Sequence, residues 1–231
     1  MSYIFDGFRH AIELILTANP ETMSAMWATI RVSSLSIAAS LAIGVPAGFV
    51  LGHTQFPGRK SIRTVVETLL ALPTVVIGLL VYTLLSKQGP AGEWGLLFTL
   101  PGIAIGQTIL GVPVITALTA TAVESLDSRL APTLLTLGAR KRHLLLTSLW
   151  EARFAVLIAG ITAYGRIVSE VGISMMVGGN IKWHTRTLTT TIALETGKGE
   201  FAMGIALGLV LIVMAFAVNI SLAVLKRRTA R

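Results

Sequence analysis

Long runs without Asp, Glu, Lys or Arg dominate the pattern of apolar and polar positions along this chain. Four such runs, of 19 to 30 residues each, cover positions 32–52, 68–86, 94–123 and 201–225. A fifth region, 154–177, is as apolar but carries Arg166 and Glu170. An α-helix needs about 20 apolar residues to cross a hydrocarbon core of ~30 Å. The pattern therefore predicts five membrane-spanning helices, at about residues 29–52, 65–86, 95–123, 152–177 and 201–225.

The segment before the first span, about residues 1–24, has a different pattern. Charged residues interrupt its apolar residues, which recur at helical spacing: Ile4, Phe5, Phe8, Ala11, Ile12, Ile15 and Leu16. No cationic stretch precedes them, so the segment does not match a signal peptide. We expect an amphipathic helix that ends near Asn19 and Pro20 and lies on the membrane surface or packs on the bundle.

Small residues recur every fourth position within several predicted spans. Glycines occupy such positions in the first span (Gly44, Gly48, Gly52), the third (Gly102, Gly106) and the last (Gly204, Gly208). A face of small residues lets two helices approach closely in lipid. Pro73 lies inside the second predicted span, where it removes a backbone donor and can kink the helix.

The composition narrows the class of protein. Of 231 residues, 53% are hydrophobic and only 13% are charged, whereas soluble domains have about 25% charged residues. These values exclude a disordered chain and argue against a soluble enzyme. The chain has no cysteine, which excludes disulfides and thiol chemistry. It has no phosphate-binding loop, dinucleotide fingerprint or zinc motif, so we expect no enzymatic activity, no bound cofactor and no metal site.

The positive charges follow the predicted loops. The formal net charge is +8, and one set of loops and ends holds twelve cations: Arg59, Lys60, Arg63, Arg129, Arg140, Lys141, Arg142, Arg153, Lys226, Arg227, Arg228 and Arg231. The opposite set holds six: Arg9, Arg31, Lys87, Lys182, Arg186 and Lys198. Cytoplasmic loops carry the excess of Lys and Arg. We therefore expect a cytoplasmic C-terminus, an external N-terminus and no nucleic-acid partner.

Arg166 and Glu170 lie one helical turn apart near the middle of the fourth predicted span. A charge at this depth costs at least ~2.5–3.5 kcal/mol on insertion scales, so both side chains should face a partner, a cavity or a protein interface. Two interpretations stay open. The residues form a structural ion pair that fixes helix packing, or they belong to a gate or pathway.

The predicted cytoplasmic loop, residues 124–147, has its own pattern. Leu130, Leu134, Leu135 and Leu137 can form one face of a short helix, Pro132 suits its first turn, and Gly138 permits a break before a basic cluster. Such a helix can insert into a groove of a cytoplasmic partner or rest on lipid headgroups. The acids beside it, Glu124, Asp127 and Glu151, are expected to be solvated.

This loop resembles the so-called EAA loop in the membrane subunits of type I ABC importers. Leu137, Gly138 and Ala139 match the Leu-Gly-Ala element of that family. The chain departs from the family where Pro132, Thr133 and Leu134 stand in place of Glu-Ala-Ala, which leaves the details of docking open.

A closer resemblance covers most of the chain and is to the permeases of tungstate importers, relatives of the molybdate permeases. It rests on segments 72–80, 151–154, 165–172, 175–181, 190–196 and 198–201. Among these, Ser-Glu-Val-Gly at 169–172 and Gly-Gly-Asn at 178–180 alone would indicate only oxyanion importers of this type.

The resemblance implies an all-α membrane protein with the MetI-like type I fold: a transmembrane domain at 25–226 and a basic cytoplasmic tail at 227–231. It implies a homodimer in the inner membrane, with cytoplasmic ATPase subunits that bind ATP and Mg, and an external tungstate-binding protein. The coupling helix to the ATPase would contain Leu130, Pro132, Leu134, Leu137, Gly138 and Ala139.

Two further groups of residues are candidates for the transport path. The pathway or gate candidates are Arg166, Ser169, Glu170 and Gly172. The external loop candidates are Gly178, Gly179, Asn180, Lys182 and Arg186, because cations concentrate a divalent oxyanion near a pore mouth and the threonines that follow offer donors. A solvated loop is the alternative for the second group.

Other functions remain compatible with the same spans. The same architecture could import molybdate, sulfate or phosphate. A protein of another class, an ion-coupled carrier or a channel, would transport without an ATPase. A membrane scaffold would not transport at all.

Overall fold

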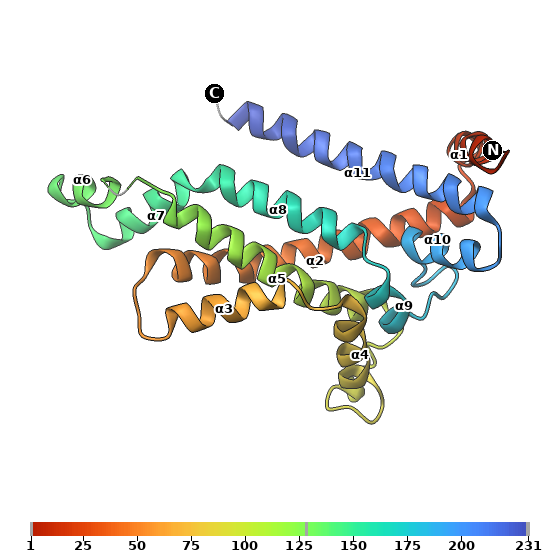
Figure 1. The fold of residues 1–231 in the computed structure, drawn as a ribbon, viewed down its shortest axis with the longest axis horizontal. Coiled ribbons are helices and arrows are strands. Elements are labelled where there is room, and N and C mark those ends of the chain that lie inside the picture. Colours follow the sequence, from red (N-terminus) through yellow and green to blue (C-terminus); the bar gives the residue numbers. More distant parts are fainter. Residues whose placement is uncertain (1, 128, 230–231) are drawn as a thin grey trace.

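The computed structural model describes residues 2–127 and 129–229, and every regular element in that part of the chain is helical. The molecule is an elongated bundle with α2 (Pro20–His53), α5 (Leu100–Glu124), α8 (Arg153–Val168) and α11 (Phe201–Thr229) along its long axis (Figure 1). The shorter helices are α1 (Ser2–Leu16), α3 (Arg59–Leu69), α4 (Thr74–Leu85), η1 (Gly92–Trp94), α6 (Leu130–Thr136), α7 (Lys141–Glu151), α9 (Gly172–Gly178) and α10 (Leu188–Gly197).

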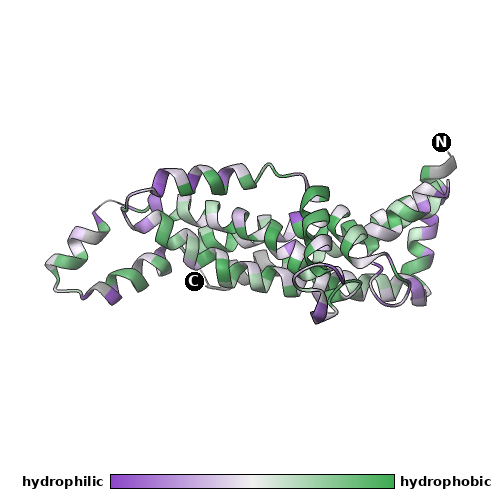
Figure 2. Ribbon diagram, turned by 90° about the horizontal axis from the view of Figure 1, so that it is seen from below, coloured by the Kyte–Doolittle hydropathy of each residue, from purple (hydrophilic) through white to green (hydrophobic). Residues whose placement is uncertain are grey.

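The two ends of the bundle are distinct. Helices α1 and α10 lie at one end, called here the α1 end, and α6 and α7 lie at the other, the α6 end (Figure 1). Apolar residues predominate along the bundle, whereas hydrophilic residues gather towards the ends and on α3 (Figure 2). In the described part of the chain, four helical stretches are long and apolar enough to span a membrane, or five if α3 and α4 count as one.

Helix α2, which contains the first predicted span, begins well before residue 29. The Asn19 side chain accepts hydrogen bonds from the backbone N–H groups of Glu21 and Thr22, at 3.1 and 3.2 Å, and Pro20 stands at the first helical position. A capping side chain followed by proline is a strong helix start. Helix α2 therefore begins at Pro20 and extends beyond the predicted span of 29–52 at its N-terminal end.

The second predicted span, 65–86, is not one straight helix. Helices α3 and α4 meet at an angle of 98°, and α4 projects sideways from the bundle (Figure 1). Pro73 lacks a backbone donor and restricts Leu72 to extended conformations, so the chain turns before Thr74. The kink expected at Pro73 is thus a complete break.

The fourth predicted span, 152–177, is also interrupted. Helix α8 ends at Val168 and α9 begins at Gly172. Between them the Ser169 hydroxyl donates to the Gly165 carbonyl at 3.0 Å, and the Glu170 carboxylate accepts from the Ile173 N–H at 3.0 Å. Side chains that bond nearby backbone groups compete with helix continuation.

Helices α2 and α5 share the most extensive contact among the described helices. A stripe of small residues on α2 faces α5: Ser36, Ser40, Gly44 and Gly48 are all buried. A Cβ added at Gly48 would lie 2.5 Å from the Thr116 carbonyl oxygen of α5. The close approach predicted from the glycine spacing of the first span is confirmed.

The amphipathic N-terminal helix is present as α1 and packs on α11. Gly7, Ala11 and Leu14 are buried at this contact, where the Gly7 position lies against Ile205. Another face of α1 is exposed and apolar, with Phe5 81% exposed. The predicted tail at 227–231 continues α11 as far as Thr229, and its last two residues lie outside the described part of the chain.

Candidate translocation site and coupling surface

Arg166 is exposed in the last turn of α8. Its Nη2 donates a hydrogen bond to the backbone carbonyl of Leu70 at 3.0 Å. Leu70 is the C-terminal cap of α3, where carbonyl groups lack helical partners. Thr162 is exposed on the same helix and Ser169 is exposed at its C-terminal cap, so a polar strip runs along α8 beside the break in the second span.

Glu170 does not pair with Arg166. It is 6% exposed, and its Oε1 accepts from the Ile173 N–H, which caps α9. Its backbone carbonyl accepts from the Thr189 hydroxyl at 3.0 Å. The interpretation of these two residues as a structural ion pair is therefore wrong, because α8 ends between them and directs each side chain to a different partner. Gly172 begins α9, and the Cβ that it lacks would lie 3.3 Å from Glu170 Oε1.

Gln107 lies at the centre of the bundle and was not among the predicted site residues. It is 3% exposed on α5. Its Oε1 accepts from the Ser36 hydroxyl of α2 at 2.9 Å, and its Nε2 contacts the Ser174 hydroxyl of α9 at 3.4 Å. One neutral side chain thus joins three helices. The sequence did contain a signal for this site, because Gln107 lies inside a run of 30 uncharged residues. A buried amide needs hydrogen-bond partners, so this position could have been predicted to contact polar groups of other helices.

The predicted coupling segment forms α6, which protrudes at the α6 end (Figure 1). Pro132 lies in its first turn, Leu134 is half-buried, and Leu135 and Leu137 are 58% and 77% exposed. Gly138 ends it in the left-handed region, at φ +78°, and the Ala139 N–H returns to the Leu134 carbonyl at 3.0 Å. The helix and its glycine end are as expected, and its docking role remains a prediction.

Glu124 is not simply solvated, as its place in the loop had suggested. Its two carboxylate oxygens each form an ion pair, one with Arg59 and one with Arg63 of α3. The Arg59 Nε also donates to the Leu51 carbonyl near the end of α2, at 2.7 Å. This cluster, called here the Glu124 clamp, joins α2, α3 and α5 next to α6.

The external loop candidates lie at the α1 end. Gly179 and Asn180 both adopt left-handed backbone conformations, at φ +67° and +51°, and terminate α9. The buried Gly178 carbonyl accepts a hydrogen bond from the Thr185 hydroxyl. These three residues therefore shape the turn after α9.

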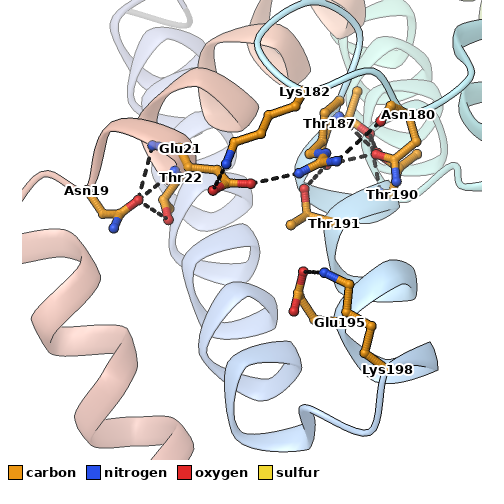
Figure 3. A network of polar contacts seen from close by, with 11 residues as sticks. Asn19, Glu21, Thr22, Asn180, Lys182, Thr187, Thr190, Thr191, Glu195 and Lys198 are labelled. Atoms are coloured by element: carbon orange, nitrogen blue, oxygen red, sulfur yellow. Dashed lines mark hydrogen bonds and ion pairs between the residues drawn. The ribbon is translucent and has the colours of Figure 1, made fainter.

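Lys182 and Arg186 are not free cations. The Lys182 Nζ and the Arg186 Nη1 each lie 2.7 Å from a carboxylate oxygen of Glu21 (Figure 3). Glu21 precedes the apolar run that begins at Val32, outside the predicted first span of 29–52. The hydrogen bond from Lys182 lowers the pKa of Glu21, burial opposes this, and Arg186 lowers it further. The cluster retains one excess positive charge.

The threonines after this loop are structural. Thr187 and Thr190 form a capping box at the start of α10. The Leu188 N–H donates to the Thr29 hydroxyl of α2 at 2.9 Å, and Thr189 bonds the carbonyl of Glu170. The expectation that these threonines offer donors to an oxyanion is not supported by these contacts, because Thr187, Thr189, Thr190 and Thr191 are buried and bonded within the protein.

Sequence comparison identifies relatives over nearly the whole chain. Residues 44–231 match the family described as the binding-protein-dependent transport system inner membrane component. The tungstate uptake system permease TupB of Campylobacter jejuni is 46% identical over 98% of this chain and 95% of its own. The TupB protein of Peptoclostridium acidaminophilum is 36% identical over 95% and 96%. The molybdenum permease ModB of Escherichia coli K12 is 28% identical over 81% and 85%.

Solved structures share the fold. The MetNI methionine ABC transporter in an inward-facing conformation gives a TM-score of 0.74 at 17% identity, with 91% of this chain and 97% of the other covered. A bacterial alginate ABC transporter, solved with its alginate-bound periplasmic protein, gives 0.75 at 18% identity, with 94% and 82% covered. The all-helical architecture is therefore that of ABC importer membrane subunits.

Proposed function

Because this chain belongs to the family of binding-protein-dependent transport system inner membrane components, we propose that it is the permease subunit of an ATP-driven tungstate importer. The two relatives at 46% and 36% identity are tungstate uptake permeases, and they match at least 95% of the chain. Molybdenum and sulfate permeases are also similar, at 24–28% identity. This difference supports tungstate as the substrate.

A homodimer is supported by α4. This helix leaves the bundle sideways and has exposed apolar residues on more than one side, including Val75, Leu79, Leu80 and Leu84. An extended apolar surface near a polar strip is typical of a subunit interface rather than of the surface of a protein that functions as a monomer. A second copy packed on α3 and α4 would cover this surface and enclose the pathway. Two identical subunits would meet around a twofold axis.

The main support for a transport path in this region is the exposed charge of Arg166. A charged side chain within a membrane span needs a polar or aqueous surrounding, and the one hydrogen bond of the Arg166 side chain to the described residues goes to the Leu70 carbonyl at the break between α3 and α4. A guanidinium presents a fork of donors that suits a tetrahedral oxyanion. We place the narrow part of the tungstate path here, with Ser169 beside it. Glu170 and Gly172 support the path by starting α9.

Energy would come from the α6 end, which we assign to the cytoplasm on the basis of its excess of cations. The chain ends with α11, whose C-terminal part reaches the same side (Figure 1). The exposed leucines of α6 would enter a groove of the ATPase subunit, which holds ATP and Mg. Closure of the ATPase dimer would move α6 and shift the bundle between inward-facing and outward-facing states. An external binding protein would deliver tungstate at the α1 end.

The decisive experiment combines assembly with uptake. Tagged chain is purified from its native membranes in mild detergent, and mass spectrometry measures the stoichiometry of co-purified subunits. Tungstate uptake is then measured in cells that carry wild-type chain, Arg166→Gln or Arg9→Gln. A hydrogen bond to a charged group contributes about 1.5–3 kcal/mol, so Arg166→Gln should lower uptake at least about tenfold.

Arg9→Gln is the matched control, because Arg9 is exposed on α1 and away from the break. It should transport at the wild-type rate. Assembled Arg166→Gln with wild-type uptake would refute the pathway. Recovery of a stable chain without an ATP-binding subunit, with transport by the chain alone in liposomes, would favour a carrier or channel. If molybdate or sulfate inhibited tungstate uptake more strongly than unlabelled tungstate does, that anion would be the substrate instead.

A further inference from the structure

An apolar groove lies between α2, α8 and the second half of α11, apart from the polar strip of α8. Its volume is about 540 Å³. Ile37 and Leu41 of α2, Leu157, Gly160 and Tyr164 of α8, and Val218 of α11 line it. Gly160 keeps it open, since a Cβ added there would meet only Leu41, at 3.5 Å or more.

Arg153 closes the groove towards the α6 end. Among the described residues that line the groove, it carries the only charge. Its guanidinium lies 4.4 Å from the ring centroids of both Trp150 and Phe154, and its Nη1 donates to the Trp150 carbonyl at 2.6 Å. Its Nε is buried and has no hydrogen-bond partner. A buried donor without a partner is unusual in folded proteins, and in the described contacts only Nη1 of this guanidinium has a hydrogen-bond acceptor.

We propose that this groove binds the acyl chain of an anionic phospholipid from the leaflet on the α6 side, with the phosphate on Arg153. Basic pockets between membrane helices on that side bind anionic headgroups. Trp150 is 63% exposed, as expected for an aromatic residue at the level of the headgroups. The exposed Arg140 and Arg142 of the nearby chain add positive charge around the same headgroup.

The dimensions of the groove fit one leaflet. Arg153 and Tyr164 lie about 16 Å apart along α8, at a rise of 1.5 Å per residue. Half of a ~30 Å hydrocarbon core is about 15 Å. An acyl chain that starts at Arg153 would therefore reach the level of Tyr164 near the bilayer centre. It would fill the space between α11 and the α2–α8 pair and hold α11 against the bundle.

The assembled complex, delipidated in detergent, tests this site. Phosphatidylglycerol and phosphatidylcholine with the same acyl chains are added separately, and the unfolding midpoint and the bound lipid are measured by thermal unfolding and native mass spectrometry. The wild-type complex should retain about one phosphatidylglycerol per chain and gain a larger midpoint shift from it than from phosphatidylcholine. Arg153→Gln should remove the difference between the two lipids.

Gly160→Phe fills the groove and should abolish retention of either lipid, which keeps the test valid if Arg153→Gln proves unstable. Two matched controls should behave as wild type: Lys60→Gln, an exposed cation on α3 outside the groove, and Gly208→Phe, whose position on α11 has open space. Equal stabilisation by both lipids in wild type would overturn the proposal. A disulfide between two copies of Gly160→Cys would also overturn it, because the groove would then be a contact between subunits. The chain has no other cysteine, so such a disulfide can form only at this position.

Discussion

Two parts of the membrane region are held together in opposite ways. Helices α2 and α5 meet through small residues and bury side chains such as Ile103 and Ile115 completely. Helix α3, by contrast, buries none of its residues. It is attached by polar contacts at its two ends, the Glu124 clamp at one end and the bond from Arg166 to the Leu70 carbonyl at the other.

This difference in packing suggests different roles during transport: α2 and α5 form a rigid pair, called here the frame, and α3 with α4 forms a unit that can move. Close packing of two helices has no alternative arrangement of similar energy, because any shift opens a gap or creates a clash. Partly exposed ion pairs are worth only about 0.2–1 kcal/mol each and can exchange partners. We therefore expect α2 and α5 to stay together during transport, while α3 and the attached α4 change position.

The largest effect should come from breaking the frame. Gly48→Leu places a side chain where even a Cβ would lie 2.5 Å from a carbonyl oxygen of α5. Overpacking of this kind costs about 3 kcal/mol, so the unfolding midpoint and the yield of folded protein should fall sharply. Gly208→Leu is the control, because its position has open space. Equal thermal unfolding of both variants would contradict the frame.

A smaller and more local effect should follow from releasing α3. Glu124→Gln removes both ion pairs of the clamp. The loss of about 0.4–2 kcal/mol should speed amide hydrogen exchange in α3 about 2–30-fold, while exchange in α2 and α5 stays unchanged. Hydrogen-exchange mass spectrometry gives both values at once.

Glu67→Gln is the matched control for the clamp. Glu67 pairs with Arg63 inside α3 and does not reach α5 in the described contacts. It should change exchange in α3 much less than Glu124→Gln. Faster exchange throughout α5 in Glu124→Gln would show that the clamp belongs to the frame instead.

The smallest effect concerns the α1 end, where Glu21 ties the start of α2 to Lys182 and Arg186. Because folding lowers the pKa of Glu21, its carboxylate stabilises the protein above its ordinary pKa of about 4.5. This contribution is lost as the pH falls through the lowered value. Glu21→Gln should lower the unfolding midpoint by about 1–2 °C at pH 7, and the difference from wild type should vanish once the pH is below that lowered pKa. A pH-independent difference would contradict the ion pairing.

Hydropathy and glycine spacing predicted the spans and the α2 face towards α5, because both follow from local composition. The ion-pair partners were beyond such reasoning. Glu124 and Arg59 are 65 positions apart, so their contact depends on how three helices pack. Arg166 and Glu170 were misleading for the opposite reason. Their spacing of one turn suits a pair only while the helix continues, and local side-chain bonds end it between them.

The bend at Pro73 also bears on how the protein is made. A straight apolar helix can leave the insertion machinery into lipid as a finished unit, whereas α4 emerges at 98° to α3 with apolar surface that its own chain leaves uncovered. If a second copy supplies the missing cover, a newly made single subunit is an unfinished product. The amount of this protein in the membrane would then depend on how quickly two copies meet, and surplus single chains would be natural targets for proteolysis.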